Sequence, residues 1–188
     1  MGGADNEFGF KLPTLDDWLQ PDAAWNVFVE PGSSCDTEPL AHVSGESWVS
    51  DVRKAELSSK VPTEIRKLFE VAKSAIIYGY LCYPLMTLGA EQLHRISERA
   101  AKVRARELGW QPKGRPKFAD AVKFLVQKGA IPTTEIVRWK ATVGLRNEGS
   151  HPAMQSIFLP SQVLDMLYIT AESIDALFLW SDGKLPVG

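Results

Sequence analysis

The chain has 188 residues, 45% of them hydrophobic, and a net charge of −2, values typical of one domain with a packed core. A secretory signal and a run of ~18 apolar residues, as a membrane helix needs, are both missing, so we expect a soluble, cytoplasmic protein without membrane contact. The two cysteines and three histidines lack metal-ligand spacing, so we expect no disulfide framework, no metal and no cofactor.

Residues 1–60 are expected to form an irregular, acidic arm. Within it, KLPTLDDWLQ indicates a short helix capped by Thr14, WNVFVEPG a short strand, and residues 46–57 a second helix. Disordered segments are usually poor in large aromatic side chains. We therefore expect the arm to dock partly on the rest of the chain. Its large aromatics are Phe8, Phe10, Trp18, Trp25, Phe28 and Trp48.

Residues 61–182 are expected to form a helical domain, followed by a C-terminal tail over residues 183–188. Apolar residues recur at spacings of three and four along five segments, separated by prolines and glycines. The five segments begin after Pro62, after Pro84, near Phe118, after Thr133 and at Ser161, which can cap the last helix. The expected fold is all-α, a five-helix up-and-down bundle with an irregular N-terminal arm.

The charge is distributed unevenly along the chain. Residues 1–59 carry −8, residues 60–118 carry +7, and the remainder carries −1. Two interpretations stay open: the acidic arm lies across the basic helices, or the basic helices meet a polyanion.

The stretch LRNEGSHP, residues 145–152, places Arg146 and His151 five residues apart. An unbroken helix would separate their directions by about 140°. Gly149 can break the helix because it adopts positive φ without penalty, and Pro152 disfavours the α conformation for His151. The two side chains can then converge. The alternative is an ordinary helix end, with an arginine in the last turn, a terminating glycine and a loop histidine.

A converging arginine and histidine suit cleavage of an RNA phosphodiester without a metal. Histidine can take the 2′-hydroxyl proton or protonate the leaving oxygen, and arginine can offset charge on the phosphate. Asn147 can orient either partner or bind substrate. No nucleophile elbow or phosphate-binding glycine loop is present, so other hydrolases and nucleotidyltransferases lack support.

Arg146, Asn147 and His151 resemble the arginine, polar residue, spacer and histidine of the HEPN family (higher eukaryotes and prokaryotes nucleotide-binding), and more narrowly the bacterial DUF4145 group. The resemblance covers roughly residues 61–180. It implies a homodimeric, metal-independent endoribonuclease in which two copies of the motif share one cleft. The expected biological role is that of a toxin or a phage-defence effector. It also implies that Arg146 polarises the phosphate, that Asn147 assists, and that His151 is the acid or base.

The same resemblance leaves a second function open, because some HEPN proteins are inactive scaffolds or partner-binding modules. The alternative is therefore a non-catalytic dimerisation module that binds a nucleotide or a protein. For either function, a regulatory protein such as an antitoxin is an expected partner.

A basic ridge is expected on the helix that begins after Pro84. Its four cations follow spacings of four, three and four, which places them within about 60° of one another around the helix. Such a ridge suits the backbone phosphates of RNA. A solvated helix face, or one neutralised by the acidic arm, is the alternative. The ridge consists of Arg95, Arg99, Lys102 and Arg106.

Overall fold

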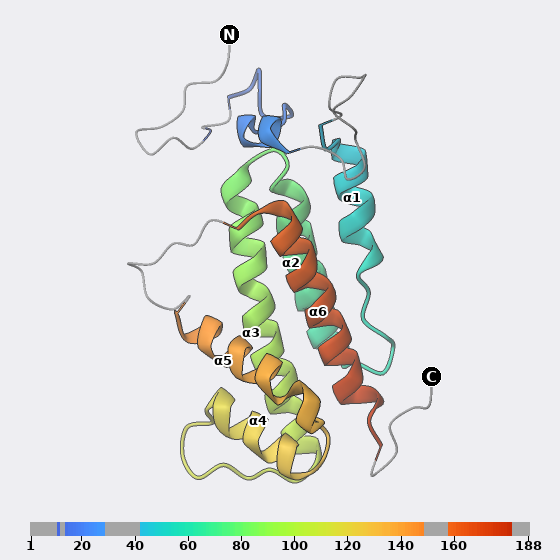
Figure 1. Ribbon diagram of the computed structural model, residues 1–188, viewed down its shortest axis with the longest axis vertical. Coiled ribbons are helices and arrows are strands. Elements are labelled where there is room, and N and C mark those ends of the chain that lie inside the picture. The colour runs from blue at the N-terminus through green and yellow to red at the C-terminus, as the bar shows by residue number, and fades with distance from the viewer. Residues whose placement is uncertain (1–10, 12–13, 29–41, 149–157, 182–188) are drawn as a thin grey trace.

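The computed structural model describes residue 11 and residues 14–28, 42–148 and 158–181. These residues form six α-helices and two short 3-10 helices, with no β-strand among them (Figure 1). The expectation of an all-α protein is confirmed. None of the described helices combines the length and apolar composition that crossing a bilayer requires.

Helices α2 (Thr63–Tyr78) and α3 (Tyr83–Glu107) form the central hairpin. Pro62 precedes α2, and Pro84 lies in the first turn of α3, where helices tolerate proline because its missing N–H would have no partner. Gly109 ends the second helix with a φ of 90°, which a glycine adopts without strain. The prolines and glycines thus delimit these helices as the sequence predicts.

The two hairpin helices approach closely at Gly89. A Cβ atom at this position would lie 2.6 Å from Ile76 Cγ1 and 2.9 Å from the carbonyl oxygen of Ala72. Real Cβ atoms essentially never come this close to other heavy atoms. The hydrogen side chain of Gly89 is therefore what lets α3 pack directly against the backbone of α2.

The remaining helices build two apolar clusters on this hairpin. The larger cluster joins α2 and α3 to α1 (Gly45–Lys54) and α6 (Pro160–Leu179). The smaller joins the C-terminal part of α3 to α4 (Phe118–Gln127) and α5 (Ile136–Glu148), which lie across the lower end of the bundle in Figure 1. Fully buried side chains include Ile65, Phe69, Leu93 and Ile174 in the first cluster and Leu125 and Ile131 in the second.

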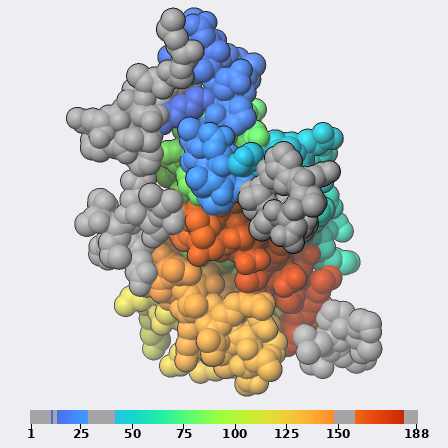
Figure 2. Space-filling view, turned by 45° about the horizontal axis from the view of Figure 1, so that its top comes forward, coloured from blue at the N-terminus to red at the C-terminus, as the bar shows by residue number. Residues whose placement is uncertain are grey.

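The arm docks on the hairpin through two tryptophans. Trp25 and Trp48 are at most 2% exposed, and their rings meet with centroids 4.8 Å apart. The indole N–H of Trp25 donates to the carbonyl oxygen of Gly79, and that of Trp48 donates to Ile76, both at 3.0 Å. Figure 2 shows residues 14–28 of the arm, in blue, seated at one end of the molecule. The expected partial docking is confirmed for these residues.

Tyr83 joins the arm to the beginning of α6. Its backbone N–H donates to Asp22 Oδ2 at 2.8 Å, which places an arm carboxylate at the start of α3. Its hydroxyl donates to the carbonyl oxygen of Phe158 at 2.7 Å, just before α6. Phe28 of the arm stacks on the Tyr83 ring, with centroids 6.1 Å apart. One side chain therefore connects three segments that are distant in sequence.

Two expectations for the arm are wrong. Residues after Thr14 form a turn rather than a helix, because Asp17 accepts hydrogen bonds from both the backbone N–H and the hydroxyl of Thr14. The expected strand is instead a 3-10 helix over Ala23–Val27, which Asp22 caps by accepting from Ala24 N. The end of that expected strand lies outside the described residues.

Two expectations for the bundle also change. The described residues contain six α-helices rather than five, because α1 of the arm packs with the others. Ser161 does not cap the last helix, which begins one residue earlier at Pro160. The side-chain oxygen of Gln162 instead accepts from Leu159 N at 3.0 Å and satisfies that N–H group.

Replacing Gly89 with alanine should destabilise the fold by about 1–3 kcal/mol, because the added methyl group overlaps a packed backbone. Urea denaturation measures this change. Gly144→Ala in α5 is the matched control, since nothing lies within 4 Å of its Cβ position. The control should be neutral or stabilising by about 1 kcal/mol, as alanine favours a helix over glycine. Equal effects of the two changes would contradict the close approach at Gly89.

Candidate functional site

Helix α5 carries Arg146 and Asn147 of the predicted motif in its last turn. The helix is anchored by Trp139, which is 4% exposed and meets Phe118 edge-on within the smaller cluster. Trp139 and Arg146 are seven residues apart, about two helical turns, so their side chains lie on the same side of α5. Burial of Trp139 therefore turns Arg146 toward α3.

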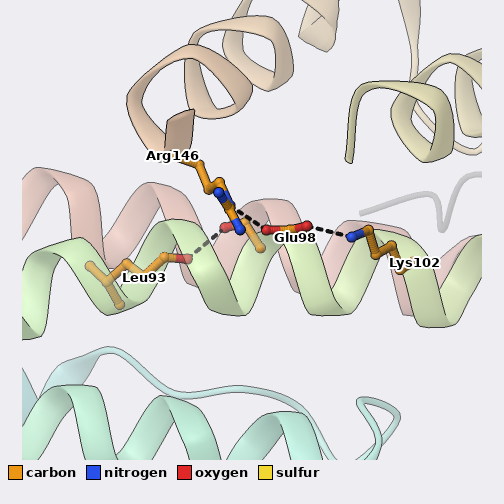
Figure 3. Close-up of polar contacts among 5 residues, drawn as sticks. Leu93, Glu98, Lys102 and Arg146 are labelled. Atoms are coloured by element: carbon orange, nitrogen blue, oxygen red, sulfur yellow. Dashed lines mark hydrogen bonds and ion pairs between the residues drawn. The ribbon is translucent and has the colours of Figure 1, made fainter. Parts of the chain in front are cut away.

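On α3, Arg146 meets a carboxylate and a lysine (Figure 3). Its Nε donates to one oxygen of Glu98, and Lys102 Nζ donates to the other. Glu98 and Lys102 are four residues apart on α3, which makes them neighbours on the helix surface. We name Arg146, Glu98 and Lys102 the ion cluster. It joins one residue of the predicted catalytic motif to one residue of the predicted ridge.

The ion cluster is partly removed from water. The side chains of Glu98, Lys102 and Arg146 are 15%, 20% and 32% exposed. Burial by itself would raise the pKa of Glu98, but the hydrogen bonds and charges of Lys102 and Arg146 outweigh burial and hold that pKa below its ordinary value. Glu98 is therefore ionised at neutral pH. The three named side chains carry two positive charges and one negative charge.

The rest of the predicted ridge does not join the ion cluster. Arg95 and Arg106 are exposed. Arg99 is also exposed and pairs with Glu64 of α2 at 2.8 Å, an interaction between side chains that are both about half exposed. Such surface pairs contribute little to stability. Within the described residues, no acidic side chain of the arm pairs with the ridge, and only Lys102 lies beside Arg146.

The other two motif residues are placed differently. Asn147 is exposed at the end of α5. His151 lies outside the described residues, as do Gly149 and Pro152, so the expected convergence with Arg146 stays a prediction. The chain returns to the described part at Phe158, which Tyr83 holds. The motif segment is thus attached to the bundle by α5 on one side and by this contact on the other.

Sequence reasoning missed Glu98, which occupies the centre of the ion cluster. A local signal exists, because a glutamate four residues before a lysine forms a favourable pair on a helix. That signal occurs on many exposed helices and names no partner elsewhere in the chain. Only the crossing of α5 over α3 reveals that Glu98 also binds Arg146.

His94 lies one turn before Glu98 on α3 and is 8% exposed. Burial lowers the pKa of this imidazole, which keeps it neutral at pH 7. A neutral imidazole adds no charge to the ion cluster next to it.

Comparisons of the chain with known proteins found no relative. No protein-family model matches the chain, and no curated protein or solved structure matches it. The function must therefore be inferred from the residues of the site and their chemistry.

Glu98→Gln should lower the free energy of unfolding by about 1 kcal/mol at pH 7, because it removes the charge that two partly exposed cations share. The pKa of Glu98 is depressed in the folded protein, so its contribution is present above the ordinary glutamate pKa and is lost as pH falls through the folded value. The difference between variant and wild type should therefore shrink toward pH 3.

Urea denaturation at both pH values measures this difference. Glu64→Gln, which breaks the exposed pair with Arg99, is the matched control and should change stability by less than about 0.5 kcal/mol at either pH. A loss for Glu98→Gln that stays the same at pH 3 would show that packing rather than charge is responsible.

Proposed function

We propose that this protein is a metal-independent endoribonuclease of the HEPN type, acting as a homodimer in the cytoplasm as a toxin or defence effector. The observation that carries the proposal is the ion cluster. A half-buried arginine from the motif and a lysine from another helix both bind one carboxylate. Such a pair of cations suits a phosphate, and the same motif supplies His151, five residues after Arg146 in sequence.

In the proposed reaction His151 takes the proton of a ribose 2′-hydroxyl. The resulting oxygen attacks the adjacent phosphorus, and the bond from phosphorus to the 5′ oxygen breaks. That oxygen leaves as a hydroxyl after receiving the proton from the imidazolium of His151, so the products are a 2′,3′-cyclic phosphate and a 5′-hydroxyl end, and His151 is neutral again. Arg146 and Lys102 stabilise the charge that gathers on the phosphate oxygens, and Asn147 contacts the substrate.

Glu98 has a positioning role in this proposal. A long arginine side chain loses rotamer freedom when it binds a phosphate, and a carboxylate that already holds its Nε reduces that loss. A guanidinium has five N–H donors and an ammonium three, so one carboxylate does not use all the donors of the two cations. Lys102 completes the cluster and binds the same carboxylate from the neighbouring turn of α3.

Exposed apolar side chains on α5 support the proposed homodimer. Val137 is 78% exposed and Leu145 is 43% exposed, although both belong to a helix that carries the motif. They are about 80° apart around the helix axis, on the side opposite to Arg146 and Trp139. Covering them with a second copy would remove apolar surface from water and bring two motif segments close together.

One observation favours the second candidate, a non-catalytic dimerisation or partner-binding module. Arg146 is already engaged by Glu98 within the chain, as it would be if the pair served only to fasten α5 to α3. In that case the wild-type protein would bind its nucleotide or protein partner and leave RNA uncut.

His151→Ala should reduce cleavage of total RNA by a factor of about 10² or more, because general acid and base catalysis is lost. The rate of product formation on a denaturing gel measures this, and circular dichroism verifies the fold. His42→Ala is the matched control, because His42 is exposed in the arm and should not affect the rate. Cleavage that survives in the His151 variant would reject the proposed site.

Chelation should leave the cleavage rate unchanged, because the proposed chemistry uses an imidazole and two cationic side chains in place of a metal ion. The test compares the rates with and without excess EDTA at constant ionic strength. Loss of activity that added Mg²⁺ or Mn²⁺ restores would contradict the metal-independent mechanism.

A further inference from the structure

A groove lies between α4 and α5. Its volume is about 550 Å³. The apolar part of its wall consists of Val122 and Val126 from α4 and of Ile136 and Val143 from α5. Figure 1 shows these two helices next to each other at the end of the molecule that is remote from residues 14–28. The groove is distinct from the ion cluster, which lies between α5 and α3.

Three polar side chains also line the groove. Lys123 of α4 and Lys140 of α5 each contribute an ammonium group, and Gln127 contributes an amide. Both lysines are exposed, and neither makes an ion pair within the part of the chain that the structure describes. A slot with apolar walls, two unpaired cations and one amide fits an amphiphilic anion.

The surrounding segment is strongly basic. Residues 109–148 contain eight lysines and arginines and three acidic residues, a net charge of +5. A second copy docked groove to groove would bring its Lys123 and Lys140 against the same two lysines, which is unfavourable, whereas the homodimer proposed above uses the Val137 and Leu145 side of α5. A nucleic-acid strand would instead release counterions as the lysines neutralise its phosphates.

The groove leads directly to the proposed site. Ile136, Lys140 and Val143 follow spacings of four and three, so they form one stripe on α5, and Asn147 extends that stripe by one more turn. Arg146 is three residues beyond Val143, about 4.5 Å farther along the helix axis. A strand that occupies the groove would therefore reach the ion cluster within about one nucleotide's length.

We infer that this groove binds a nucleotide of single-stranded RNA next to the bond that is cut. The base lies between the valine and isoleucine side chains, as bases do in apolar pockets that accept a nucleotide taken out of a stack. Gln127 can hydrogen-bond the edge of the base, and Lys123 and Lys140 contact the flanking phosphates. The inference rests on the proposed function and adds the substrate class, single strands rather than duplexes, and the residues that hold them.

Binding is tested in the full chain with His151→Ala, so that RNA remains intact. The probe is a short fluorescein-labelled single-stranded oligoribonucleotide, and fluorescence anisotropy gives its Kd. Lys123→Glu combined with Lys140→Glu should weaken binding by about tenfold or more, because two phosphate contacts become repulsive. Lys67→Glu on α2 is the matched control, since this exposed lysine has no ion pair in the described residues and lies outside the groove. It should change Kd by less than about twofold.

A second variant separates base binding from charge. Ala119→Leu enlarges an exposed side chain in the groove wall and leaves the charge unchanged. It should weaken binding of the oligoribonucleotide by about threefold or more, and leave unchanged the binding of an oligonucleotide of the same length without bases. Equal effects on both probes would overturn the placement of a base in the groove.

The result is independent of the cleavage test. Unchanged affinity in the double lysine variant would overturn the inference and leave the groove to a protein partner, while the His151 result would still decide the proposed function. The converse also holds: if the wild type binds the probe through the groove but cuts no RNA, the proposed function fails and the nucleotide site stands.

Discussion

Helix α3 is the constraint on which the rest of the molecule depends. It packs against α2, α4, α5 and α6, so its 25 residues must supply apolar contacts in several directions at once. Small buried residues make these approaches possible, because they let neighbouring backbones come close. Glu98 and Lys102 lie on the side of α3 that these apolar contacts do not use, beneath α5. The small residues include Gly89, Ala90, Ala100 and Ala105.

The bundle was predictable from sequence to the extent that its signals are local. The periodic apolar residues predict which side of each helix is buried, and Pro62 and Pro84 predict where α2 and α3 begin. The arm was not predictable in this way. Its 3-10 helix depends on Asp22, which bonds to the hairpin, and on Trp25, whose indole reaches Gly79 at a separation of 54 residues. Local propensity contains no information about such contacts.

In the candidate site, too, the residue with a local sequence signal was predictable and the residue that depends on a long-range contact was not. Arg146 was identifiable from its motif, whereas Glu98 acquires its role only because the burial of Trp139 turns Arg146 toward α3. For the ridge, the sequence pattern predicts more than the structure contains. Its spacing on α3 is regular, yet Arg99 pairs with Glu64 and Lys102 turns to Glu98, so a uniform row of cations does not result. Two cations without ion pairs in the described residues, Lys123 and Lys140, line the groove between α4 and α5, where sequence reasoning did not look.

The contact at Gly89 has a consequence for distances far from it. Sliding α2 along α3 by a single residue would replace the glycine with a side chain at the point where the backbones nearly touch, so the hairpin has one permitted register. Glu98 is nine residues farther on, about 13.5 Å along the axis. The position of Glu98 along the hairpin axis relative to α2 is thereby fixed, so a single hydrogen side chain determines which residues of α2 lie level with a carboxylate more than two turns away.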